Sequence, residues 1–520
     1  MSLHALTTSN SAHALDHSFL TGALAKGALF EANQRPNDAI AIYQQILAKM
    51  PTVEEPINRI AQIFIRHKEY ANAIKALQYQ LSISQEKGKV LFTLGIVNEL
   101  MDNQTAAFDY LKRSVQEDPR AVDPYFSLFT VAKVTHKVDQ IKDFIKAQLE
   151  HQDHAGTKHY ILGKLAEEEK ALELAHTHFS EAEQTGLYER QLPYFYRDFA
   201  FLKHKLKDYP SAFNYHRKAQ SLFGSKPEVK QVDTEKFKRF TQKSLQWFSS
   251  ERVKDWQPLA LENEKSPIFV VGFPRSGTTL IEQMLHAHPN LVVTDEAPVL
   301  KRSVTNLSKI LNKKIEYPSG YKNLKTADIK KWREHYFKEI KAGLQEQEKS
   351  LRIVDKHPMS LRHLGTIKRF FPDAPIIVML RDPRDVCLSN FFQTFRTNAF
   401  SAQCFDLEST FKLYANTMSL YLHFKQHLGL NILEIKYEDM CCDTENKMRE
   451  VAAHIGEDFS DNMLNYYDDN FKRVVSTPSF EGVAKPIYHS AMQKWKNYET
   501  FVKPYQPIVA RFIETFGYEL

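Results

Sequence analysis

Apolar residues in the first half of the chain follow helical spacing and recur with a period of 34 residues. One position of each period is Ala39, Ala73, Ala107, Ile141 or Ala175, and the bulky or apolar position four residues later is Tyr43, Leu77, Leu111, Ile145 or Phe179. Glycines stand twelve residues before three of the first positions, at Gly27, Gly95 and Gly163. Small residues let two helices pack closely, so the pattern predicts about six stacked helix hairpins over residues 21–225, an all-α solenoid. The sixth, around Ala212 and His216, follows after three extra residues.

The second half of the chain changes to short apolar runs that are separated by helical segments. These runs, which are typical of buried strands, are 268–271, 291–293, 352–355 and 376–380. Strands that alternate with helices predict an α/β domain with a mainly parallel sheet, which we place at 265–520. A polar, helix-compatible connector is expected at 226–264, and residues 1–20 are expected to form an N-terminal tail.

Composition narrows the functional classes. The chain has 520 residues, of which 43% are hydrophobic and 25% charged, as in a globular protein of two or three domains. A formal net charge of +6 is mild, so it suits anionic ligands and does not indicate a nucleic-acid binder. Residues 1–21 lack the pattern of a signal peptide, and no apolar run approaches the length of a membrane span. Four cysteines without zinc-like spacing favour a reducing, cytoplasmic location.

The first of these short apolar runs leads into a loop that has the features of an anion site. Gly272 ends the expected strand and residues 276–279 open an amphipathic helix, so free backbone N–H groups and the positive helix end converge there. The spacing is that of a Walker loop, but Thr278 replaces the lysine that nucleoside triphosphates need, and Arg275 is the only cation. The loop is predicted to hold a phosphate without being built for ATP hydrolysis; an ordinary tight turn is the alternative.

A second strand-to-helix junction carries another candidate anion site. The last apolar run is followed by Arg381, and Asp382 is placed to cap the next helix. Ser389 comes eight residues after Arg381, so the two side chains could grip one phosphate together. A surface cluster of salt bridges made by Arg384 and Asp385 is the alternative.

The first loop resembles that of the sulfotransferases. Their 5′-phosphosulfate loop has the form Pro-(Lys/Arg)-Ser-Gly-Thr-Thr, which residues 274–279 match. The resemblance assigns binding of the donor phosphosulfate to Arg275, Ser276, Gly277, Thr278 and Thr279. The 34-residue period, in turn, resembles the tetratricopeptide repeat. The chain is therefore expected to be multidomain, with a tetratricopeptide solenoid followed by an α/β, P-loop-like sulfotransferase domain.

Further segments fit the same family. The resemblance assigns binding of the 3′-phosphate to Arg381 and Ser389, and a contact with adenine to Tyr437. Lys485 and the later segment 493–495 resemble the C-terminal lid of the family, so the resemblance assigns a contact with the cofactor to Lys485. Two phosphate sites imply 3′-phosphoadenosine 5′-phosphosulfate (PAPS) as donor and adenosine 3′,5′-bisphosphate as product. No metal is required in this scheme, because arginine, lysine and backbone N–H groups supply the positive charge.

Candidate catalytic residues follow from a closer resemblance to the tyrosylprotein sulfotransferases, over roughly residues 265–518. In that group the glutamate 21 residues after the loop arginine is the base, and here that residue is Glu296. Lys356 would join Arg275 in stabilising charge on the leaving phosphate. Cytosolic sulfotransferases use a histidine near that lysine, so His357 is the alternative base. Glu296 could instead only cap the helix that follows it.

The function implied is transfer of a sulfuryl group from PAPS to an acceptor hydroxyl, with protein tyrosine first among the acceptors. A small-molecule or saccharide hydroxyl is the alternative. A nucleotide kinase or NTPase, and a non-catalytic repeat scaffold, are rivals from other classes. Unlike the tyrosylprotein enzymes, the sequence shows neither a membrane anchor nor an evident cysteine pair. The expected partner is a protein or peptide acceptor presented by the repeats, without nucleic acid or membrane; the oligomeric state is left open, a homodimer included.

Overall fold

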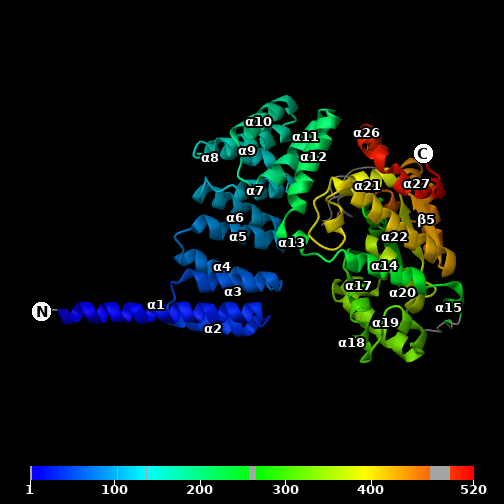
Figure 1. Cartoon of the computed structure of the whole chain (residues 1–520), viewed down its shortest axis with the longest axis horizontal. Coiled ribbons are helices and arrows are strands. Elements are labelled where there is room, and N and C mark those ends of the chain that lie inside the picture. The colour runs from blue at the N-terminus through cyan, green and yellow to red at the C-terminus, as the bar shows by residue number, and fades with distance from the viewer. Residues whose placement is uncertain (1–2, 102, 136, 255, 257–264, 469–491) are drawn as a thin grey trace. The chain divides into compact units, whose positions relative to one another are not determined.

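The computed structural model describes residues 3–101, 103–135, 137–254, 256, 265–468 and 492–520 (Figure 1). The chain divides into two compact units, Met1–Gln191 and Leu192–Leu520. Within the described residues, no helix is both long enough and apolar enough to cross a membrane.

The first unit consists of consecutive helices that pair into hairpins. The helices are α1 (Leu3–Ala32), α2 (Pro36–Lys49), α3 (Glu54–Arg66), α4 (Tyr70–Ile83), α5 (Lys87–Leu100), α6 (Gln104–Glu117), α7 (Asp123–Val134), α8 (Val138–Leu149), α9 (Ala155–Glu168) and α10 (Leu172–Thr185). Each odd-numbered helix packs against the helix that follows it, and neighbouring hairpins stack within the unit (Figure 1). This arrangement confirms the helical solenoid predicted from the sequence.

The 34-residue pattern is explained by close packing inside each hairpin. All five positions from Ala39 to Ala175 are fully buried. A Cβ added to Gly27 would lie 2.4 Å from the ring of Tyr43, and one on Gly163 would lie 2.5 Å from the ring of Phe179. The bulky residue of the second helix therefore occupies the space that the glycine leaves in the first, as the sequence predicts.

The second unit begins with one more helix hairpin and continues into shorter helices. These elements are α11 (Leu192–Lys205), α12 (Tyr209–Gly224), α13 (Pro227–Lys230), α14 (Glu235–Trp247) and α15 (Ser250–Lys254). Ala212 and His216, the phase positions of the sixth repeat, lie on α12 and are buried. The domain limits drawn from the sequence, at residues 20, 225 and 264, stay predictions.

The core of the second unit is a parallel sheet with the strand order β2-β3-β1-β4-β5. The strands are β1 (Ile268–Gly272), β2 (Leu291–Asp295), β3 (Arg352–Lys356), β4 (Ile376–Leu380) and β5 (Ile432–Lys436). After β1 the chain adds β2 and β3 on one side and β4 and β5 on the other. The strand order thus reverses at β1, and ligands of open parallel sheets bind at the carboxyl ends of strands beside such a point.

Helices cover both faces of this sheet. They are α16 (Thr278–His286), α17 (Val299–Thr305), α18 (Leu307–Leu311), η1 (Ser319–Asn323), α19 (Thr326–Lys341), η2 (Glu346–Ser350), η3 (Pro358–His363), α20 (Leu364–Phe370), α21 (Pro383–Phe391), η4 (Ser401–Gln403), α22 (Leu407–His427), α23 (Tyr437–Cys442), α24 (Thr444–Ile455), η5 (Asp461–Met463), η7 (Lys494–Tyr498), α26 (Glu499–Val502), η8 (Lys503–Tyr505) and α27 (Gln506–Thr515). Side chains of β1 alternate between two cores, Phe269 and Val271 in one, Ile268 and Val270 in the other. The strand is buried on both faces, which explains its continuous apolar sequence.

Candidate active site

The loop between β1 and α16, residues 272–277, is shaped by two glycines and is called the phosphate loop below. A Cβ at Gly272 would lie 2.7 Å from the carbonyl oxygen of Met379 on the neighbouring strand. Gly277 has φ +97°, and a Cβ there would lie 2.5 Å from the ring of Tyr437. Arg275 also adopts positive φ, +74°. The backbone therefore turns tightly into the N-terminus of α16, a nine-residue helix, which is the geometry of an anion cradle.

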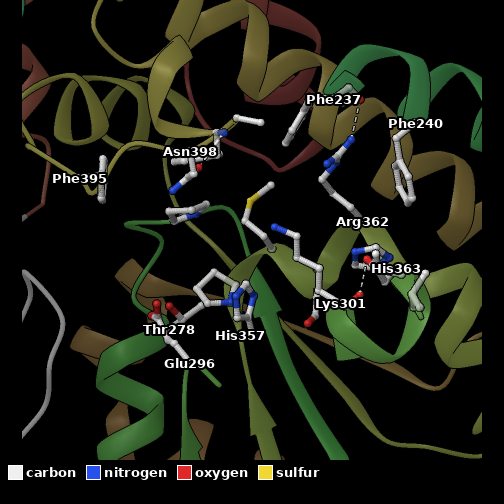
Figure 2. A pocket seen from close by; sticks show the side chains of 18 of the residues that line it. Phe237, Phe240, Thr278, Glu296, Lys301, His357, Arg362, His363, Phe395 and Asn398 are labelled. Carbon is white, nitrogen blue, oxygen red and sulfur yellow. Dashed lines mark hydrogen bonds between the residues drawn. The ribbon is translucent and has the colours of Figure 1, made fainter. Parts of the chain in front are cut away.

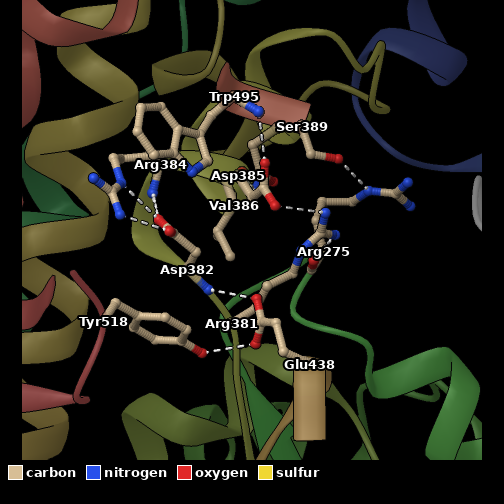
Figure 3. A network of polar contacts seen from close by, with 11 residues as sticks. Arg275, Arg381, Asp382, Arg384, Asp385, Val386, Ser389, Glu438, Trp495 and Tyr518 are labelled. Carbon is tan, nitrogen blue, oxygen red and sulfur yellow. Dashed lines mark hydrogen bonds and ion pairs between the residues drawn. The ribbon is translucent and has the colours of Figure 1, made fainter. Parts of the chain in front are cut away.

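Two arginines from different strand ends meet at this loop (Figure 3). Nε of Arg275 donates to the hydroxyl of Ser389 at 3.1 Å, and Nη1 of Arg381 donates to the carbonyl of Arg275 at 3.2 Å. Arg381 also pairs with Asp385 at 3.3 Å. The structure thus brings together Arg275, Arg381 and Ser389, which the sequence had placed in two separate motifs.

Lys494 is a further cation beside these arginines. Burial and the neighbouring guanidinium of Arg381 lower the pKa of Lys494, and Arg275 acts in the same direction. The carboxylate of Asp385 acts in the opposite direction and balances part of the repulsion among these three cations. The sequence pattern placed Lys494 in a lid segment without giving it a role. Lys485, which that pattern did assign to the cofactor, lies outside the described residues.

Arg384 and Asp385 anchor helix α21 and do not form a surface cluster. The Asp382 carboxylate caps α21 by accepting from the Arg384 backbone N–H at 2.9 Å, as predicted. It also pairs with the Arg384 side chain, whose guanidinium lies 3.8 Å from the centre of the Trp495 ring. Asp385 accepts a hydrogen bond from the Trp495 backbone at 2.8 Å. Asp382, Arg384 and Asp385 are all buried, so their salt bridge and hydrogen bonds hold α21 in place inside the unit.

Tyr437 lies between the two anion sites. Its ring covers Gly277 of the phosphate loop, and the guanidinium of Arg381 lies 4.9 Å from the ring centre. The next residue, Glu438, accepts hydrogen bonds from the Asp382 backbone at 3.2 Å and from the Tyr518 hydroxyl at 2.9 Å. The tyrosine ring is therefore placed where a planar base could stack beside two phosphate-binding features.

Lys356 ends β3 and is completely buried between two carboxylates. Its ammonium lies 2.6 Å from Oε2 of Glu282 on α16 and 2.7 Å from Oε1 of Glu296 after β2. The register that pairs Asp295 with Lys356 explains why Glu296 reaches this position. The N-cap of the following helix is Pro298, so the carboxylate of Glu296 pairs with Lys356 and does not cap that helix.

Burial and charge work against each other in this carboxylate–lysine–carboxylate triad. Burial raises the pKa of Glu282 to about 7, although Lys356 lowers it. Burial also acts to lower the pKa of Lys356, but Glu282 and Glu296 outweigh it and hold that pKa above its usual value. Lys356 is therefore charged at neutral pH. Sequence reasoning missed Glu282, whose only signal is that it is the single carboxylate of α16.

A cavity of about 1190 Å³ opens above the phosphate loop. Glu296, His357 and Thr278 lie together at one end of it (Figure 2). Burial lowers the pKa of His357, and the Nδ1 atom of this histidine is buried without a hydrogen-bond partner. Both candidate bases thus face the same cavity, but only Glu296 pairs with Lys356.

The rest of the cavity is apolar with basic residues around it. Its apolar lining residues include Phe237, Phe240, Val304, Leu307, Ile315, Tyr317, Met359, Phe395 and Phe400, and its basic residues away from the two anion sites are Lys236, Lys301, Arg362 and Arg396. His357 and His363 also line it, but burial lowers the pKa of each, to about 3 for His363. Glu296 is the single carboxylate among the described lining residues. The space beyond Glu296 therefore suits a partly apolar molecule that carries negative charge.

The sequence of the chain is similar to those of several known proteins. Among curated proteins, the chain is 30% identical over 313 residues to an uncharacterized protein of Aquifex aeolicus, covering 58% of this chain and 40% of that protein. It is 25% identical over 240 residues to protein-tyrosine sulfotransferase A of Caenorhabditis elegans, covering 45% and 62% of the two chains. The chain therefore spans less than two thirds of the length of either relative.

Two further similarities complete the comparison. A solved sulfotransferase domain from the Synechococcus PCC 7002 olefin synthase is 24% identical, with a TM-score of 0.36 over 51% of this chain and 99% of that domain. Residues 267–461 match the family described as the sulfotransferase family, and this segment contains the phosphate loop, the triad and the arginine pair. The segment that carries the candidate site is therefore similar in sequence to the sulfotransferase family.

Proposed function

We propose that the second unit transfers the sulfuryl group of PAPS to an acceptor hydroxyl. The observation that carries the proposal is the meeting of two anion-binding features in one site: the lysine-free phosphate loop, and the cluster of Arg275, Arg381, Ser389 and Lys494. Two such features fit a nucleotide with phosphates at both its 5′ and 3′ positions. Gly277 supports this arrangement, because a side chain there would displace the ring of Tyr437 that packs on the loop.

In this proposal the residues of the chain divide the work. Backbone N–H groups of residues 276–279 and the side chain of Arg275 hold the 5′ end of the donor. Arg381, Ser389 and Lys494 hold its 3′-phosphate, and Tyr437 supports the base. PAPS supplies the activated sulfuryl group, and we assign to Arg275 and the buried Lys356 the stabilisation of the negative charge that transfer leaves on the phosphate.

Glu296 is the proposed general base. A tyrosine hydroxyl has a reference pKa near 10, so its proton must pass to a base as the new S–O bond forms at neutral pH. The Glu296 side chain is 38% exposed and lines the cavity, whereas Glu282, on the other side of Lys356, is buried and does not. Glu296 is therefore the carboxylate of the triad that an acceptor can reach.

A protein tyrosine is the acceptor class that we propose. The apolar wall formed by residues such as Phe237, Phe240 and Met359 suits a phenol ring, and the basic residues near it suit acidic side chains next to a tyrosine. The name of the C. elegans relative points to the same acceptor. Presentation of that acceptor by the helical repeats, and a reducing cytoplasmic location, remain predictions made from the sequence.

Binding of two nucleotides tests the donor assignment. Adenosine 3′,5′-bisphosphate should raise the melting temperature of the purified chain, because a ligand that binds only the folded state stabilises it by mass action. ATP with Mg²⁺ should raise it far less. Equal shifts would indicate a general nucleotide site, and no shift with either would favour a non-catalytic scaffold.

A further inference from the structure

The terminal helix hairpin, α11–α12, packs against the α/β core of the second unit. One face of α12 makes this contact through Tyr209, Phe213, His216 and Gln220, which follow one another at helical spacings of four, three and four. The ring of Phe213 stacks on that of Phe501 with centres 4.1 Å apart, and Tyr209 meets Tyr498 edge-on at 5.5 Å. The hairpin is thus part of the packed unit that contains the site.

His216 and Gln220 grip the segment that follows helix α21. The His216 ring stacks on Phe392, with centres 3.9 Å apart and planes 15° apart. Nε2 of Gln220 donates to the carbonyls of Phe391 and Gln393, the second at 2.9 Å. Phe391 is the last residue of α21, and carbonyls at a helix end have no partner within the helix. Residues 391–393 are called the clamped turn below.

His216 departs here from the role its repeat position has in other hairpins. Tyr43 and Phe179, at the equivalent positions, fill the space above a glycine of their own hairpin. His216 instead lies between Phe201 of α11, which it meets edge-on at 4.9 Å, and Phe392. Burial lowers the pKa of His216 to about 3, so the ring is neutral at physiological pH and stacks without the cost of burying a charge.

The clamped turn joins the two ends of the site. Just before it, Asn390 donates to the carbonyl of Pro274 in the phosphate loop at 2.8 Å, and Ser389 accepts from Arg275. Just after it, residues 394–396 and 398–400 line the cavity on the acceptor side. The donor side has anchors of its own, since Asp385 is held by the Trp495 backbone. The acceptor wall has local contacts too, such as the bond from the Ser401 hydroxyl to the Arg396 carbonyl and the packing of Phe400 on Phe273, and its path begins at the turn that α12 holds.

We propose that Gln220 and His216 are positioning residues, through which the terminal repeat fixes the clamped turn and with it the acceptor wall at residues 394–400. Neither side chain lines the cavity. Loss of the clamp should therefore weaken acceptor binding and leave binding of the bisphosphate nearly unchanged. The kinetic part of this inference rests on the proposed function; the structural part does not.

The test compares full-length chains that differ at one position of α12. Gln220→Leu removes both hydrogen bonds while keeping the bulk, and Asn214→Leu, on the exposed face of the same helix, is the matched control. Amide hydrogen exchange is measured with adenosine 3′,5′-bisphosphate bound. Exchange at residues 392–400 should become about fivefold faster or more in Gln220→Leu and stay unchanged in Asn214→Leu.

The kinetic readout uses a synthetic peptide with one tyrosine between glutamates. Its KM should rise about fivefold or more in Gln220→Leu, with kcat and bisphosphate affinity within about twofold of wild type. Should Gln220→Leu fail to fold, His216→Phe, which keeps the stack, and His216→Ala, which removes it, decide the matter: only the second should show the fast exchange and high KM. Unchanged exchange in a folded Gln220→Leu or His216→Ala overturns the clamp. If the wild type sulfates no peptide while exchange responds as stated, the proposed tyrosine acceptor is wrong and the clamp stands.

Discussion

The ammonium of Lys356 lies 2.7 Å from the carboxylate of Glu296, at the carboxyl edge of the parallel sheet. The two residues are 60 positions apart and belong to the ends of neighbouring strands. Because Lys356 is completely buried, this pair cannot rearrange freely. The contact places a carboxylate that lines the cavity beside a buried positive charge.

Replacing Glu296 by glutamine should remove the base and keep its shape. We expect turnover to fall by roughly a hundredfold or more, since general-base catalysis contributes about this much, with bisphosphate affinity nearly unchanged. His357→Asn is the comparison, and should reduce turnover much less. Initial rates with PAPS and the tyrosine peptide, together with bisphosphate titration, provide the measurement. Loss of turnover in His357→Asn, with Glu296→Gln close to wild type, would make histidine the base.

The buried carboxylate of Glu282 should make stability depend on pH. Its pKa is raised from 4.5 to about 7, so between these pH values the folded chain keeps a proton that the unfolded chain has released. The free energy of unfolding of the second unit should therefore fall as pH rises through this window, by up to roughly 3 kcal/mol. Glu282→Gln has no proton to release there and should flatten the slope.

Melting temperatures between pH 4.5 and 7.5 measure this effect, on the transition that the bisphosphate shifts. Glu445→Gln, which changes an exposed carboxylate on α24, is the control and should retain the wild-type slope. Parallel curves for wild type and Glu282→Gln would show that Glu282 stays ionised in the folded chain.

Arg381 should distinguish nucleotides by their 3′-phosphate. Arg381→Ala should weaken adenosine 3′,5′-bisphosphate by about tenfold or more, because a charge-assisted contact to phosphate is lost, and should hardly affect adenosine 5′-monophosphate. Arg396→Ala, which removes a cation from the acceptor side of the cavity, should change neither affinity. Calorimetric titration of both nucleotides checks this. Equal losses for the two nucleotides would move the 3′-phosphate away from Arg381.

The packing of the terminal hairpin predicts where the chain can be divided. A fragment of residues 192–520 should fold and bind the bisphosphate like the full chain, because α11–α12 packs on its core. A fragment that begins at Ser250 exposes the surface that Phe213 and Trp247 cover, and should melt several degrees lower or aggregate. Circular dichroism and bisphosphate titration compare the two. Equal stability of the fragments would show that the hairpin is dispensable.

Local patterns in the sequence were enough to predict most of the architecture. The 34-residue period and the glycine positions predicted the hairpins, because each contact lies within a single hairpin. The phosphate loop was also predictable, since one strand, one loop and one helix start build it. Glu296 and Lys356 were found through a spacing typical of a family, and the structure pairs them.

The remaining features depend on contacts between distant segments. Glu282 becomes a partner of Lys356 only after α16 has packed on the sheet, and Lys494 joins Arg381 from a segment more than a hundred residues away. In the sequence Gln220 is an ordinary polar residue of a repeat, and its role is visible only in the structure, where α12 packs against the end of α21. No periodicity or motif encodes these meetings, because the sheet order and the helix packing create them.

Transfer of label from PAPS tests the central claim most directly. The full chain is incubated with PAPS carrying radioactive sulfur and the tyrosine peptide, without added metal, and the labelled residue is located by mass spectrometry. The account predicts sulfate on the tyrosine oxygen with the wild-type chain, and roughly a hundredfold less with Glu296→Gln. Label on a saccharide or small-molecule hydroxyl, with none on peptide, would leave the transferase assignment intact and correct the acceptor. Absence of transfer to any hydroxyl, by a folded chain that binds the bisphosphate, would contradict the account.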